Sequence, residues 1–163
     1  MKYQKTILAA ALALLFPVAQ AANLDLTWGD PKEFRDVRPT YEGRTKFQNR
    51  VMAELSEQFE KEAAKLPEGE TLHVKVNDLD LAGELEYFHF GYENGLRVIR
   101  RVDFPSMKLS YELRDAQDKV IKSGEDKFSD LGFNSTLLTT RSRFTSPLAY
   151  EKQMISKWYQ ESF

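Results

Sequence analysis

The chain has 163 residues, a formal net charge of −2 and no cysteine. The absence of cysteine excludes disulfide bonds, thiolate-bound zinc, a thiol nucleophile and a lipid-modified cysteine. A mildly acidic chain has no overall attraction for nucleic acid or anionic lipid, so we expect neither to be a partner.

The first 21 residues have the pattern of a cleavable signal peptide. Lys2 and Lys5 form a positive region, an apolar run covers residues 7–16, and Ala-Gln-Ala ends at Ala21. This order is typical of a secretory signal, and the run is shorter than the ~20 residues that span a bilayer. We expect cleavage after Ala21, a periplasmic protein without stable membrane insertion, and one domain over residues 22–163.

The first part of the mature chain predicts a strand, a loop and a long helix. Residues 23–28 alternate between apolar and polar side chains, as in a half-buried strand. Residues 32–41 are a charged segment that we interpret as a loop. Apolar residues then recur at every fourth position, which predicts a helix over residues 45–66. Thr45 and Gln48 have the spacing of a capping box at its start.

Residues 71–87 predict a strand with an irregularity. The apolar side chains fall on even numbers up to Val76 and on odd numbers from Leu79 onward. Because side chains alternate with a period of two, this slip would turn the second group away from the core. One extra residue at Asn77-Asp78, a β-bulge, restores their direction. We therefore expect a bulged central strand.

Three further strands are expected. Asn94-Gly95 is a tight-turn signal, and residues 96–102 alternate after it. Residues 107–113 alternate without exception, which predicts an antiparallel strand with one solvated face. A turn at residues 115–118 leads to a hairpin partner over residues 119–128.

The C-terminal part predicts a loop over residues 129–145 and then a helix. Ser146 and Pro147 are expected at its N-cap and first position, and Leu148, Ile155, Trp158 and Tyr159 share one side. The order of elements predicts a single α+β domain, with a mainly antiparallel sheet of about four to five strands and both helices on one face.

The acidic segment at residues 78–84, DLDLAGE, is the strongest candidate site. Asp78, Asp80 and Glu84 offer the carboxylate oxygens that Ca²⁺ prefers. Their spacing does not match an EF-hand loop, because Leu81 and Ala82 stand where further oxygens are needed. The structural alternative is that the aspartates organise a bend and the glutamate is solvated, and we favour it.

Arg100 is the expected partner of this segment. It falls on the apolar face of its strand, where an unpaired charge is costly, so we expect an ion pair with the Asp78/Asp80 region. His73 has no ligand-type residue at i+2 or i+4, His89 lies between two phenylalanines, and we expect no metal site at either. The sequence lacks GxSxG, HExxH, Walker and dinucleotide-binding patterns, so we expect no cofactor and no catalytic residue.

Several segments together resemble one known family. They are residues 28–31, 34–38, 66–69, 77–84, 97–100 and 150–158. The chain resembles a proteobacterial family of small exported proteins that is catalogued only as a domain of unknown function. The resemblance implies a periplasmic, single-domain protein of a Gram-negative bacterium, and it carries no activity or catalytic residue. Family members often have glycine in the turn at residues 115–118, which here reads DAQD.

Three hypotheses for function follow. The first is a non-catalytic domain that binds another envelope component, through the DLDLAGE segment or an open sheet edge, and that lacks a deep polar pocket. The second is a small-ligand or cation-binding protein that uses Asp78, Asp80 and Glu84. The third is a hydrolase with two carboxylates in a concave pocket, because such an enzyme needs no short motif. The sequence leaves the oligomeric state open.

Overall fold

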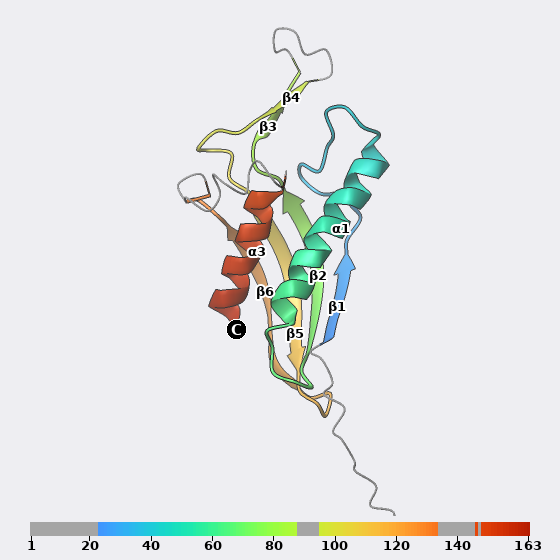
Figure 1. Ribbon diagram of the computed structural model, residues 1–163, viewed down its shortest axis with the longest axis vertical. Coiled ribbons are helices and arrows are strands. Elements are labelled where there is room, and N and C mark those ends of the chain that lie inside the picture. The colour runs from blue at the N-terminus through green and yellow to red at the C-terminus, as the bar shows by residue number, and fades with distance from the viewer. Residues whose placement is uncertain (1–22, 88–94, 134–145, 147) are drawn as a thin grey trace, which may run out of the picture.

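The computed structural model describes residues 23–87, 95–133, 146 and 148–163. The main sheet has the strand order β1-β2-β5-β6, in which β2, β5 and β6 are antiparallel neighbours and β1 is parallel to β2. Two helices, α1 and α3, lie on one face of this sheet (Figure 1). The predicted α+β fold is therefore confirmed. The bounds are β1 Asn23–Trp28, α1 Arg44–Ala63, β2 Thr71–Asp80, β5 Ser106–Arg114, β6 Val120–Ser129 and α3 Ala149–Ser162.

The core lies between the sheet and the two helices. Val51, Leu55 and Phe59 of α1 are buried at the four-residue spacing that the sequence shows. Trp158 of α3 stacks on Phe128 of β6 with ring centroids 5.5 Å apart. These side chains join both helices and both halves of the sheet in one apolar cluster. Without disulfide bonds, burial of this surface is the main source of stability.

The expected bulge is present in β2. Val76 lies opposite Leu109 and Asp78 lies opposite Lys108, so Asn77 is the extra residue. Leu79 is consequently buried, although it breaks the even-numbered pattern. The parity change in the sequence thus located the bulge correctly.

A separate two-stranded hairpin extends beyond the main sheet (Figure 1). It consists of β3 (Glu84–Glu86) and β4 (Leu96–Val98). The predicted strand over residues 96–102 is therefore too long, since pairing with β3 ends at Val98 and the chain turns at residues 101–102. Asn94, His89 and residues 134–145 lie outside the described residues. No helix in the described part of the chain is long and apolar enough to cross a membrane.

Both predicted helix caps are wrong. The N-cap of α1 is Gly43, which makes no side-chain cap, and the amide of Gln48 instead donates to Pro31 O at 2.8 Å and Val37 O at 3.3 Å. The buried Gln48 amide thereby satisfies carbonyls of the preceding loop. At the second helix, Ser146 Oγ accepts a 3.4 Å hydrogen bond from Leu148 N, but α3 begins only at Ala149.

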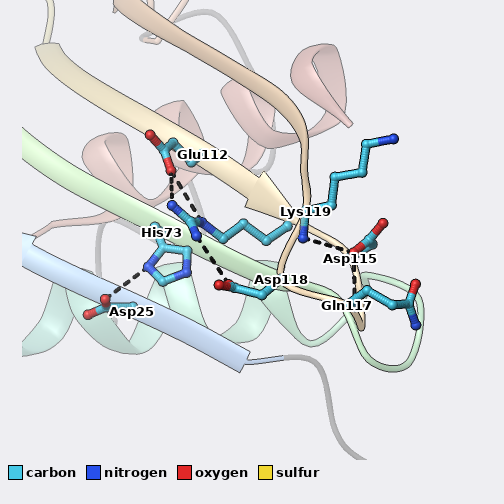
Figure 2. Close-up of polar contacts among 8 residues, drawn as sticks. Asp25, His73, Glu112, Asp115, Gln117, Asp118 and Lys119 are labelled. Atoms are coloured by element: carbon cyan, nitrogen blue, oxygen red, sulfur yellow. Dashed lines mark hydrogen bonds and ion pairs between the residues drawn. The ribbon is translucent and has the colours of Figure 1, made fainter.

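The β5–β6 turn closes on an unusual backbone conformation. Asp118 has φ +61°, and its N–H donates to Asp115 O at 2.9 Å. The carboxylate of Asp115 accepts hydrogen bonds from the N–H groups of Gln117 and Lys119, as Figure 2 shows. On the solvated sheet face nearby, His73 lies 2.9 Å from Asp25 (Nδ1 to Oδ2) across β1 and β2.

Candidate functional site

The DLDLAGE segment, residues 78–84, is the end of β2 together with the bend that leads to β3. Gly83 has φ +84°, and a Cβ atom there would lie 2.7 Å from Val98 O. Its N–H donates to Asp103 O at 2.9 Å. The bend needs glycine at this position, because a side chain would clash with β4 and left-handed backbone is costly for other residues.

The two aspartates are tied to the preceding loop. Asp78 Oδ1 accepts a 3.0 Å hydrogen bond from the backbone N–H of Arg35, and Asp80 Oδ2 lies 3.7 Å from Arg35 Nη1. Asp36 forms a β-bridge with Asp80. Burial raises the pKa of Asp80, the Arg35 charge opposes this shift, and the charges of Asp36 and Asp78 add to it. The interpretation that the aspartates organise a bend is thus supported by their contacts.

The arginine assignment needs a correction. Arg100 pairs with Glu86 of β3, because β4 ends at Val98 and Arg100 stands beside the small hairpin, away from β2. Arg35 takes the expected place beside the aspartates. Glu84 is exposed at the start of β3. It follows the bend in the chain, whereas Asp78 precedes it.

Arg97 of β4 is the residue that holds the bend. Its Nη1 contacts Asp36 Oδ2 at 2.8 Å and Gly83 O at 3.0 Å, and its Nη2 donates to Arg38 O at 3.2 Å. One guanidinium therefore joins the hairpin, the bend and the loop after β1. The planar fork of arginine suits such a set of divergent acceptors.

Glu151 is a site residue that sequence reasoning missed. It is 2% exposed, and its Oε1 accepts a 2.7 Å hydrogen bond from Ala82 N. Its Oε2 is buried without a hydrogen-bond partner among the described residues. Burial raises the pKa of Glu151 to about 7, against the opposing effects of the Ala82 hydrogen bond and the charges of Arg97 and Lys152. A signal was present, because Glu151 precedes Ile155 and Trp158 at the i+4 and i+7 positions of the buried face.

Two hollows flank the DLDLAGE segment, and both are lined in part by Arg38 and Leu81. The larger, which we call the groove, has a volume of about 720 Å³. Its lining includes Arg35, Asp36, Asp80, Glu84, Tyr87 and Val102.

The smaller hollow, which we call the cavity, has a volume of about 280 Å³. Its lining includes Tyr41, Phe47, Leu81, Ile99, Leu148 and Glu151. The lining also includes Glu42 and three arginines, Arg38, Arg50 and Arg97, so the cavity wall combines apolar side chains with charged groups, of which the Glu151 carboxyl group is buried.

A metal centre is not assembled in the described part of the chain. No group of three or more His, Asp or Glu side chains there is arranged to hold a metal ion. Asp78 and Asp80 are instead engaged by Arg35. The described residues therefore provide no set of three or more side chains that could coordinate the cation of the second hypothesis.

The fold and the site define a small α+β protein that gathers its polar groups at the end of a central strand. A family model described as "Protein of unknown function (DUF3016)" matches residues 22–161. The chain therefore belongs to this family, and the resemblance to a family of unknown function is confirmed. No curated protein and no solved structure matches the chain.

Proposed function

We propose that this DUF3016 protein is a periplasmic, non-catalytic domain that binds another envelope component through the groove. The observation that carries the proposal is the exposure of Tyr87 and Val102 in the lining of the groove, at 53% and 74%. Exposed apolar side chains that gather at a hollow mark interaction sites. Tyrosine and arginine, which also line it, are the side chains that dominate binding energy at protein interfaces.

Two acidic groups of the groove have partners of their own. Asp36 is bound by Arg97, and Asp80 lies against Arg35. The binding hypothesis expected no deep polar pocket, and the groove departs from that expectation. Because the carboxylates of Asp36 and Asp80 are already paired, we infer that the groove recognises a partner mainly through its apolar and arginine side chains, while Asp103 Oδ2 in its lining has no hydrogen-bond partner among the described residues.

The test is recovery of a bound envelope component by tagged protein from cells. Val102→Glu places a charge in the groove and should lower recovery at least tenfold, because charging a central apolar contact costs more than about 1.4 kcal/mol. Ile121→Glu is the matched control, since Ile121 is 48% exposed near the start of β6, at the opposite end of the sheet. Equal recovery with Val102→Glu, or equal loss with the control, would refute the proposal.

Export is proposed from the pattern of residues 1–21. Fractionation should place the full chain in the periplasm, and a chain without these residues should stay in the cytoplasm. Recovery of the intact protein in the cytoplasm would contradict it.

A hydrolase is the second candidate, because the groove holds several carboxylates, and the pKa of one of them, Asp80, is raised by burial. Turnover of an ester or glycoside by wild type that is lost in Asp80→Asn would favour this candidate over the first.

A further inference from the structure

The cavity is built from four parts of the chain and lies apart from the apolar rim of the groove. Tyr41 comes from the loop before α1, Phe47 from the first turn of α1, Ile99 from the segment after β4, and Leu148 from the start of α3. A volume of about 280 Å³ is just below the ~300–1,000 Å³ of pockets for drug-sized ligands. It is therefore the size of a ligand with few atoms.

Two buried polar atoms beside this space lack a hydrogen-bond partner among the described residues. They are Glu151 Oε2 and Tyr150 Oη, which belong to adjacent residues in the first turn of α3 and whose side chains both line the cavity. Leaving a buried acceptor unpaired costs about 1–3 kcal/mol, and more for a charged group. A ligand that brings donors to these two atoms would recover that free energy.

The positive charges around the cavity do not supply those donors. Arg97 is bound to Asp36 and to backbone carbonyls. Arg50 pairs with Glu42 at 2.5 Å and with Glu54 at 3.3 Å, and Lys152 also pairs with Glu54. Arg38 is exposed. The carboxyl group of Glu151 is thus stabilised by the N–H of Ala82, by its own backbone N–H and by the nearby charges of Arg97 and Lys152, but it forms no salt bridge among the described residues.

We propose that the cavity binds a small primary amine, whose ammonium group donates to Glu151 Oε2 and Tyr150 Oη. An ammonium group has three donors and no acceptor, which suits two unpaired oxygens. The aliphatic part of the ligand packs against Phe47, Leu81 and Ile99. The amine comes either from a free alkylamine or from the lysine side chain of a partner protein, because both present the same group.

The protonation of Glu151 is also linked to amine binding. Burial raises the pKa of Glu151 to about 7, so its carboxyl group is partly protonated near neutral pH. A bound cation favours the ionised form and lowers that pKa. Amine binding at pH 7 therefore releases a proton, and the measured heat depends on the ionisation enthalpy of the buffer.

The test is the melting temperature of the full mature chain at pH 7.5 with butylamine or Nα-acetyl-lysinamide. At tenfold excess over the dissociation constant, a ligand that binds only the folded state raises the melting temperature by about 5 °C. Sodium butyrate and sodium chloride at equal ionic strength are the controls and should give no rise. A rise with butylamine alone indicates a free amine, and a rise with both amines indicates that a lysine side chain also fits.

Three variants make the test specific. Glu151→Gln should abolish the rise, and Ile99→Trp should do so by filling the cavity without altering the carboxyl group. Glu62→Gln removes an equally buried glutamate that is outside the cavity, and it should keep the full rise. The proposal is overturned if neither amine raises the melting temperature, if butyrate raises it as much, or if Ile99→Trp still responds.

Discussion

Two equally buried glutamates of this protein are held in opposite ways. Glu62 and Glu151 are both 2% exposed. Burial acts to raise the pKa of Glu62, but Lys65, Ser156 and Gln58 together hold it below the usual value. Glu151 receives a hydrogen bond from Ala82, and burial raises its pKa to about 7. A contacting lysine and several donors keep Glu62 ionised, whereas the stronger desolvation of Glu151 favours its protonated form.

The stability of the protein should therefore depend on Glu151 near neutral pH. Its folded pKa of about 7 exceeds the ordinary 4.5, so the folded state takes up a proton first as the pH falls. As the pH falls from about 8 to about 4.5, protonation of Glu151 therefore increases the free energy of unfolding. Glu151→Gln mimics the protonated form and should be more stable than wild type at pH 8, by on the order of 3 kcal/mol, and about equal at pH 4.5.

Urea unfolding of both proteins from pH 4.5 to 8.5 measures this difference. Glu62→Gln is the control of opposite sign. Because the folded pKa of Glu62 is lowered, its carboxylate stabilises the fold above the ordinary pKa, and the substitution should destabilise throughout this range. A wild-type minus Glu151→Gln difference that is flat with pH would contradict the assignment.

At the scale of single elements, the β5–β6 turn carries a residue in an unfavourable conformation. Asp118 has φ +61°, a region where glycine has no steric cost. Its carboxylate contacts Arg114 at 3.1 Å, but this pair is exposed and contributes little.

Asp118→Gly should raise the free energy of unfolding by about 0.5 kcal/mol, because relief of the left-handed backbone outweighs the lost surface pair. Thermal melting checks the change. Asp115→Gly is the matched control in the same turn, and it should lower the melting temperature, since Asp115 accepts hydrogen bonds from two backbone N–H groups. Destabilisation by both substitutions would show that the Asp118 side chain outweighs its backbone strain.

Elements with a strict period were predictable, and their ends were not. The periodicity of α1 and β5 and the parity change before Leu79 reflect burial of one face, which a single sequence records directly. The predicted cap of α1 is wrong because the Gln48 amide, which could have bonded to the start of the helix, instead donates to carbonyls of the preceding loop. That choice depends on where the loop lies in space, which no local pattern contains.

At the scale of the whole molecule, Arg97 joins parts that are distant in sequence. Asp36, Arg38 and Gly83 all meet its guanidinium group. From the sequence alone, either Arg97 or Arg100 could have been the arginine at the bend. In the structure β4 ends at Val98, so Arg97 lies within the strand and contacts the bend, whereas Arg100 lies beyond the strand and pairs with Glu86. The class of fold followed from the order of elements, whereas the partner of each charge followed from tertiary structure.

Arg97→Lys should lower the free energy of unfolding by about 2–3 kcal/mol, because an ammonium group cannot reach all three acceptors and leaves Asp36 poorly paired. Urea unfolding measures it. Arg100→Lys keeps the charge of an exposed pair and should change the value by less than about 0.5 kcal/mol. If the two substitutions had equal effects, Arg97 would not be the residue that holds the bend.

Among the described strands, β6 is an edge of the main sheet, with β5 as its neighbour. Its face toward the helices carries Lys122, which contacts Ser162 O, and Asp126, which accepts a 2.8 Å hydrogen bond from Trp158 Nε1. Charged side chains on the inner face of an edge strand hinder sheet-to-sheet aggregation, because an added strand would have to bury them. The long edge of β6 can thus stay open in a crowded compartment without seeding fibres.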